Sequence, residues 1–293
     1  MLTRERIALR VLEEAGGSLN KTTFVKTMFL LRMETELNEL PSFYDFVPYK
    51  YGPHSFALYR DLHRWKSYGY VSEGSDYVAL NEKFLGETQH QTNELAGHLQ
   101  NTIADIVERY GGLKLSPLIK YVYDRYRWYA LSSERSERNL FPIPSRPKAT
   151  PAVYTIGYEG KTVDAFFNYL LEKGIETIID VRANPISRKY GFAGRRMKEI
   201  GERIGIGYLH FPSLGVPRHR RAILTDRASR NRLFSLYEQT TLVDSKNDVA
   251  RLGNYMKCKP SALVCVEKDV ECCHRSRLAH AIANVTGLEV MNL

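Results

Sequence analysis

Residues 152–293 alternate short apolar runs with longer helical patterns, and this alternation restricts the possible folds more than any other feature of the sequence. Five short runs are expected to be strands: Val153–Ile156, Ile175–Val181, Tyr208–Phe211, Ala262–Val266 and Glu289–Asn292. Four helical patterns lie between them: Val163–Lys173, Asn231–Glu238, Asp248–Met256 and Ser276–Val285. Such alternation favours parallel strands, whose faces the connecting helices cover. The sequence therefore predicts an α/β three-layer domain with a mostly parallel sheet of about five strands.

Residues 1–141 have a different pattern, in which helices dominate. Helical spacing of apolar residues covers Arg4–Ala15, a second stretch that ends at about Leu37, and Ser55–Trp65. Two short runs at 68–71 and 77–80 flank a Ser-Glu-Gly-Ser turn and predict a hairpin. Helices followed by a short hairpin are the outline of a winged helix-turn-helix. We therefore predict an α+β N-terminal winged-helix-like domain that binds nucleic acid; the alternative is a helical packing domain without a ligand.

Between the two regions, residues 142–151 hold four prolines and few apolar residues. A proline-rich segment of this kind forms a stiff linker. The expected organisation is a nucleic-acid-binding domain at 1–141, a linker at 142–151 and a catalytic domain at 152–293.

Composition indicates the compartment. The chain has no run of about 18 apolar residues that could cross a bilayer, and its first residues lack the apolar core of a secretory signal. Its four cysteines, two of them adjacent, do not form the pattern of a disulfide framework. We therefore expect a cytoplasmic protein with no membrane partner.

Positive charge is concentrated in one stretch. Residues 182–232 contain 13 Lys and Arg against 3 Asp and Glu, a surplus of 13 − 3 = 10, whereas the formal charge of the whole chain is +9. A concentrated basic segment favours a polyanionic partner over a merely solvated face. We expect that partner to be nucleic acid, and DNA rather than RNA.

Two carboxylates follow predicted strands. Asp180 ends the second strand of this region and Glu267 follows the fourth, so both are expected at one edge of the sheet. Paired carboxylates in a partly dry cleft can act as acid and base, or can stabilise a cationic sugar. In the alternative, each carboxylate pairs with an arginine, Asp180 with Arg182 or Arg188, and only orders loops. Tyr158, on the first turn, is expected to stack on a base or to donate its hydroxyl.

Arginines near this edge suit phosphate oxygens. A guanidinium group can hold phosphate in bidentate geometry, and a helix N-terminus such as that expected near Arg275 favours an anion. The residues expected to hold phosphate near the catalytic site are Arg182, Ser187, Arg188, His274 and Arg275. Contacts to phosphates farther from the site, independent of the base sequence, are expected from Arg195, Arg196, Arg218, Arg220 and Arg221.

The cysteines leave several roles open. Cys265, Cys272, Cys273 and His274 are zinc-ligand types, but three of them are consecutive, whereas structural zinc sites usually space their ligands in separated pairs. Cys273 could instead be a reactive thiolate near a helix N-terminus, or these residues could serve only packing and capping. Because the spacing is unusual, we expect no metal and no other cofactor.

Four blocks in the C-terminal half resemble the domain of unknown function 488 family. They are Tyr154–Glu159, Asp180–Arg188, Tyr208–Gly215 and Cys265–Arg275, in that order. The N-terminal stretch Phe43–Leu62, with its Tyr-Gly-Pro motif, is similar to Panacea-like proteins, a group associated with antitoxins. That second resemblance implies a recognition module.

These features together predict an enzyme that acts on DNA. The leading hypothesis is hydrolysis of the N-glycosidic bond of a modified or damaged base, as in repair or phage defence, because one or two carboxylates can activate water and stabilise a cationic sugar. A magnesium-dependent nuclease that uses the same carboxylates is the first alternative. A non-enzymatic DNA-binding regulator or antitoxin is the second.

Overall fold

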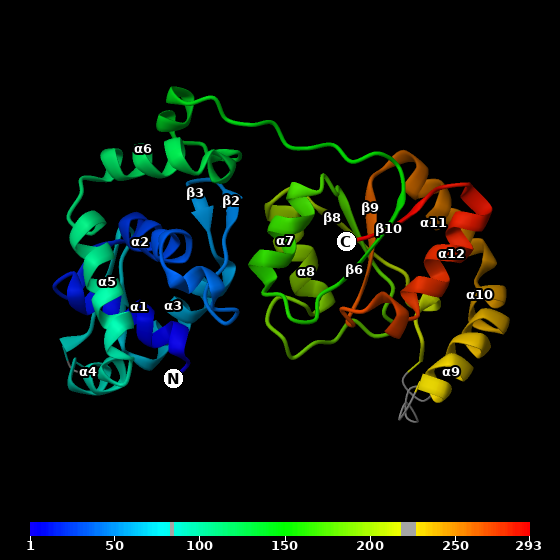
Figure 1. The fold of residues 1–293 in the computed structure, drawn as a ribbon, viewed down its shortest axis with the longest axis horizontal. Helices are drawn as coiled ribbons and strands as arrows, with labels where there is room; N and C mark the ends of the chain where they lie inside the picture. The colour runs from blue at the N-terminus through cyan, green and yellow to red at the C-terminus, as the bar shows by residue number, and fades with distance from the viewer. Residues whose placement is uncertain (83–84, 218–226) are drawn as a thin grey trace. The chain divides into compact units, whose positions relative to one another are not determined.

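The computed structural model describes residues 1–82, 85–217 and 227–293 (Figure 1). The chain divides into two compact units, Met1–Ser145 and Arg146–Leu293, each with its own core. The division falls within the proline-rich segment 142–151. None of the described helices has the length and apolar character needed to span a bilayer.

The first unit combines helices with two small sheets. Its helices are α1 (Thr3–Glu14), α2 (Lys21–Glu34), α3 (Phe56–Tyr68), α4 (Leu85–Asn93), α5 (Gly97–Tyr110) and α6 (Leu115–Arg125), with 3₁₀ turns at Glu36–Glu39, Arg127–Ala130 and Ser136–Leu140. Its strands are β1 (Ser18–Asn20), β2 (Val47–Tyr49), β3 (Gly52–His54), β4 (Val71–Glu73) and β5 (Tyr77–Leu80). An antiparallel sheet has the order β1-β5-β4, and β2 pairs with β3 as a separate hairpin.

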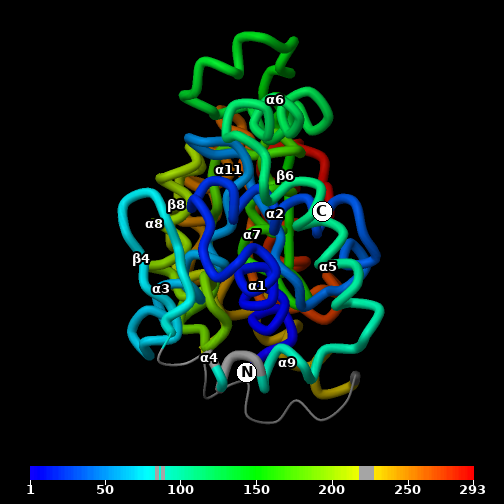
Figure 2. The backbone as a smooth tube through the Cα atoms, turned by 90° about the vertical axis from the view of Figure 1, so that its left-hand side faces the viewer, coloured from blue at the N-terminus to red at the C-terminus, as the bar shows by residue number. Residues whose placement is uncertain are grey.

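Helix α2 is the centre of this unit, and α1 and α5 lie beside it (Figure 2). It begins at Asn20, whose side chain accepts hydrogen bonds from the backbone of Thr22 and Thr23 and so satisfies two amide groups that the helix leaves free. Phe24, Met28 and Phe29 of α2 are fully buried. The sequence predicted the hairpin of β4 and β5, but not β1 or the β2–β3 hairpin.

The second unit is an α/β domain. Its strands are β6 (Val153–Gly157), β7 (Thr177–Asp180), β8 (Gly207–His210), β9 (Ser261–Cys265) and β10 (Val290–Asn292). Its helices are α7 (Val163–Glu172), α8 (Gly194–Arg203), α9 (Arg227–Gln239), α10 (Thr241–Asp244), α11 (Lys246–Cys258) and α12 (Arg275–Thr286), with 3₁₀ turns at Pro212–Leu214 and Val270–Cys272. All five strands are parallel, in the order β10-β6-β9-β7-β8. The predicted five-stranded α/β sheet is therefore confirmed, whereas α8 was not predicted.

The connections reverse their side of the sheet at β9. Helices α7 and α8, which follow β6 and β7, lie on one side of the sheet, and α11 and α12 lie on the other (Figure 1). Leu252, Leu278 and Ile282 of the latter two helices pack on Ile179 and Leu263 of the sheet. The helix that follows β9 lies on one face of the sheet, whereas the helices that follow its neighbours β6 and β7 lie on the other face. Ligands of α/β proteins usually bind where the connections change face in this way, so we expect a ligand at the carboxyl end of β9.

Candidate functional site

The carboxyl ends of β7 and β9 lie next to each other. The two strands are parallel neighbours, and Asp180 is in register with Val264. Glu267 follows three residues later in the chain, just beyond the end of β9. Both carboxylates therefore belong to the same edge of the sheet, but their surroundings differ.

Asp180 is enclosed in an ion pair. Its side chain has no exposed surface, and Arg182 donates from Nε to Oδ1 at 2.8 Å and from Nη2 to Oδ2 at 2.5 Å. The Tyr208 hydroxyl also donates to Oδ2, at 2.8 Å. This is the alternative arrangement considered for Asp180, in which an arginine holds the carboxylate. In this arrangement Asp180 cannot touch a substrate.

Tyr158 and Arg182 belong to the same buried network. Arg182 is 2% exposed, and its Nη1 donates to the Tyr158 hydroxyl at 3.0 Å and to the Phe192 carbonyl at 2.9 Å. The Tyr158 ring stacks on the Phe192 ring with centroids 4.3 Å apart. Neither side chain is available to stack on a base or to hold a phosphate. Together they fix the loops that follow β6 and β7.

Glu267 is partly buried, and its loop is held from two sides. Arg275, at the start of α12, donates from Nη1 to the Glu267 carbonyl at 2.5 Å and from Nη2 to the Lys268 carbonyl at 3.1 Å. At the end of β6, a Cβ on Gly157 would lie only 1.8 Å from the Glu267 carbonyl oxygen, so only glycine permits this approach. Arg275, expected to bind phosphate, therefore positions the Glu267 loop instead.

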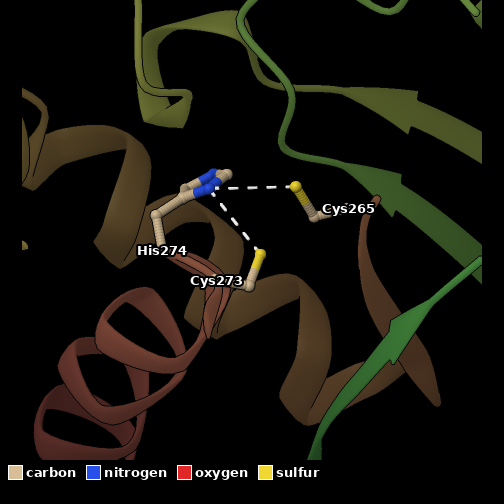
Figure 3. A group of neighbouring side chains, drawn as sticks. All are labelled: Cys265, Cys273 and His274. Atoms are coloured by element: carbon tan, nitrogen blue, oxygen red, sulfur yellow. Dashed lines mark hydrogen bonds between the residues drawn. The ribbon is translucent and has the colours of Figure 1, made fainter. Parts of the chain in front are cut away.

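Three other side chains converge beside this loop (Figure 3). Nδ1 of His274 lies 3.8 Å from the Sγ atoms of both Cys265 and Cys273, and Figure 3 shows the imidazole turned towards both sulfur atoms. On the other side of the ring, His274 Nε2 lies 3.1 Å from the carbonyl oxygen of Val181. His274, also expected to bind phosphate, is thus buried and faces the two thiols. We name Cys265, Cys273 and His274 the thiol–imidazole cluster.

Cys272 points away from this cluster. Its Sγ lies 3.3 Å from Asp269 Oδ2 and 3.1 Å from Arg230 Nη1. The reason is the extended backbone of Cys273, with φ −130° and ψ 140°, because neighbouring side chains of an extended segment point to opposite sides. Of the three consecutive zinc-ligand types, Cys272 thus lies apart, whereas Cys273 and His274 meet at one point.

Burial and local charge shift the ionisation of these groups. Burial raises the pKa of Glu267, and negative charge at Cys273 raises it further. For Cys273, burial opposes ionisation, but hydrogen bonds from its neighbours, first that of Cys265, hold the pKa of the thiol well below its usual range. The pKa of Cys265 is raised by its hydrogen bond to Cys273 and by burial. Cys273 is therefore the first of the two thiols to ionise.

Unlike Arg182, His274 and Arg275, which are buried, the other described residues predicted to bind nucleic acid lie at or near the surface. Arg188 is exposed, and the Ser187 hydroxyl accepts from the backbone of Lys189 at 3.2 Å. Arg195 and Arg196, at the start of α8, are exposed and pair with Glu199 at 2.9 and 2.8 Å. The remaining three predicted contacts, Arg218, Arg220 and Arg221, lie outside the described residues.

Two lysines near the carboxyl edge were not predicted. Lys189 Nζ donates to the Tyr158 carbonyl at 3.1 Å, and burial, together with the positive charges of Lys268 and Arg275, lowers the pKa of Lys161. Both lysines lie in loops that follow β6 or β7. We selected the carboxylates because they lie just after predicted strands, and the same criterion could have identified these two lysines.

Residues 162–282 match the family model described as "Domain of unknown function DUF488". This match confirms the resemblance of the C-terminal half, and it includes Asp180, Glu267 and the thiol–imidazole cluster. A search of the curated proteins and a search of the solved structures found no match. The similarity of the N-terminal half to Panacea-like proteins stays a prediction.

Proposed function

We propose that the chain is a cytoplasmic enzyme that binds DNA and hydrolyses the N-glycosidic bond of a modified or damaged base, with Glu267 as the carboxylate that acts on the reacting nucleotide. The proposal depends on one observation: Glu267 is a partly buried carboxylate just beyond the carboxyl end of β9, where the strand order and the connections lead us to expect a ligand. Among the described residues it has no ion-pair partner. Asp180, the other carboxylate predicted for the reaction, is sealed by Arg182.

Of the two predicted carboxylates only Glu267 is accessible, which suits glycosidic cleavage better than metal-dependent strand cleavage. Breaking the bond to a base develops positive charge on the sugar, which one carboxylate can stabilise while it orients water. A magnesium-dependent nuclease that uses Asp180 and Glu267 would need both carboxylates free to bind the ion. The burial of Asp180 in its ion pair therefore favours the glycosidic reaction over the nuclease.

Two further observations support a DNA partner. In the first unit, the element order is α1, β1, α2, β2, β3, α3, β4, β5 and the sheet order is β1-β5-β4; apart from the β2–β3 hairpin between α2 and α3, this matches the outline of a winged helix. In the second unit, Arg188, Arg195 and Arg196 are exposed and can contribute charge contacts to phosphates. The target nucleotide would leave the base stack to reach Glu267, a reaction suited to repair or to defence against phage.

The test uses duplexes that each carry one modified base. The full chain is incubated with them, alkali then cleaves any abasic site, and strand breaks are measured. We expect alkali-dependent breaks with the wild type and at least about 100-fold slower formation with Glu267→Gln. The matched control is Glu172→Gln at the exposed end of α7, where a glutamine oxygen can still accept from Asn168; it should act as the wild type does.

Absence of abasic sites from every duplex would refute the proposed reaction. Equal rates for the wild type and Glu267→Gln would refute the role of Glu267. Salt-sensitive DNA binding that survives Glu267→Gln, with no product from either protein, would instead identify a non-enzymatic regulator.

A further inference from the structure

We propose that Cys265, Cys273 and His274 bind a zinc ion, contrary to what their spacing in the sequence suggested. Their ligand atoms, the two Sγ atoms and Nδ1 of His274, all lie within 4.8 Å of one another. The inference is independent of the proposed reaction, since it concerns only what this cluster binds.

The distances suit a tetrahedral ion. Zinc holds thiolate sulfur at ~2.3 Å and imidazole nitrogen at ~2.0 Å, so tetrahedral angles place sulfur and nitrogen about 3.5 Å apart. The two observed distances from His274 Nδ1 to sulfur are both 3.8 Å. A shift of about 0.3 Å would bring each of the two nitrogen–sulfur distances to this value.

The histidine is already oriented as a ligand. Its Nε2 lies 3.1 Å from the Val181 carbonyl oxygen, which can only accept, so Nε2 carries the proton. Nδ1 then has a free lone pair, and it faces both sulfur atoms (Figure 3). Zinc-bound histidines usually donate their second ring nitrogen to a carbonyl or carboxylate in this way.

The fold holds the three ligands rigidly. Cys265 is the last residue of β9, while Cys273 and His274 directly precede α12, and all three side chains are almost completely buried, at 1%, 0% and 4% exposure. The Tyr237 ring of α9 lies edge-on to the imidazole, with centroids 5.4 Å apart. Two buried thiols and a buried imidazole are the ligand types that zinc binds.

Three protein ligands leave a fourth position, and Glu267 lies beside the cluster. Its Oε2 is 3.3 Å from Cys265 Sγ, but Glu267 does not belong to the set of atoms within 4.8 Å of one another. Zinc sites with three protein ligands keep the fourth for water or substrate, whereas structural sites are closed by four. The geometry points to a site of the open kind, with Glu267 next to the bound water.

The test is metal binding by the full chain. The purified wild type should contain about one zinc ion per chain by mass spectrometry of the metals. After removal of zinc with a chelator, cobalt(II) should give the visible bands of a tetrahedral ion and the near-ultraviolet bands of sulfur-to-cobalt charge transfer. A wild type that contains no zinc and gives no such cobalt bands would overturn the proposal, whatever any variant does.

Variants identify the ligands. Cys265→Ser and Cys273→Ser should each weaken zinc binding by more than about 100-fold. Cys258→Ser, on the exposed side of α11, and Cys272→Ser, which faces Asp269 and Arg230, are the matched controls and should keep the metal. Loss of metal in Cys272→Ser alone would show that the ligand set is wrong. Circular dichroism of each variant separates loss of the metal from loss of the fold.

The rival is a disulfide between Cys265 and Cys273. It predicts a mass lower by two hydrogen atoms and two fewer thiols that react after unfolding without reductant. Either result in protein purified under air would overturn the zinc site. Base removal is not part of this test, so the zinc site and the proposed reaction can fail separately.

Discussion

Strands β7 and β9 are neighbours; Asp180 is the last residue of β7 and Glu267 lies two residues beyond β9, and the surroundings of these two carboxylates are opposite. Asp180 is followed two residues later by Arg182, which turns back and occupies both of its oxygens. Glu267 has no such partner among the residues described, and its loop is held through backbone carbonyls instead. The comparison shows that two carboxylates at one edge of a sheet can differ in their access to a ligand. The difference arises because the chain provides a counter-charge for Asp180 and none for Glu267 among the described residues.

The largest expected effect tests this comparison directly. Asp180→Asn should lower the free energy of unfolding by about 3–5 kcal/mol, because it leaves the buried guanidinium of Arg182 without a counter-charge. Glu267→Gln should change it by less than about 1 kcal/mol. Urea unfolding of both variants and the wild type measures the difference.

Similar losses of stability in the two variants would contradict the comparison. A double replacement, Asp180→Leu with Arg182→Met, provides the control, because it removes the buried charges together. It should recover most of the stability that Asp180→Asn loses, since no charge remains unpaired.

A second expected effect extends the comparison to the first unit, where Lys26 is buried without an acidic partner among the described residues. Burial lowers its pKa to about 7, with the charge of Arg135 contributing, and its Nζ donates to the Tyr51 carbonyl at 2.6 Å. At a pH between this pKa and the ordinary pKa of lysine, Lys26 is protonated in the unfolded chain but not in the folded chain. Stability should therefore rise by about 2 kcal/mol from about pH 7 to about pH 9.

Lys26→Met should abolish that rise, because methionine does not titrate. Lys50→Met, at an exposed lysine that pairs with Glu134, should keep it. The measurement is urea unfolding across this pH range. An equal pH dependence in the wild type and Lys26→Met would show that Lys26 stays charged when the chain folds.

The smallest effect on stability is expected at Arg195, which is exposed, in contrast to the buried Arg182. Arg195→Ala should leave stability unchanged within error, because exposed ion pairs such as that with Glu199 contribute little. If this surface binds DNA, the same change should weaken binding and reduce the slope of affinity against salt by about 1. Unchanged binding at low salt would remove Arg195 from the interface.

Much of the fold could be predicted because it depends on local patterns. The five strands of the second unit are short apolar runs between helical segments, and parallel strands bring their carboxyl ends to one edge. Strand β1 was missed because Ser18–Asn20 is too short to show alternation. Helix α8 was missed because its apolar face consists mainly of Met197 and Ile200 among charged residues.

The site was harder to predict, because it depends on side-chain directions that distant segments determine. Arg182 turns towards Asp180 because Tyr158 and the Phe192 carbonyl accept from its other nitrogen. Cys273 and His274 meet Cys265 because a short 3₁₀ turn and an extended residue precede α12. Neither arrangement has a signature in residue spacing alone.

The contact between Gly157 and the Glu267 carbonyl has a consequence for where this unit can be cut. Strand β6 pairs with β9 along its whole length, from Val153 opposite Ser261 to Gly157 opposite Cys265, yet β6 precedes the residues that match the family model. A fragment of residues 162–282 would lack β6, so one edge of β9 would lose its paired strand and the Glu267 loop would lose its contact with Gly157. A fragment intended to keep the Glu267 loop in its present position must therefore include β6.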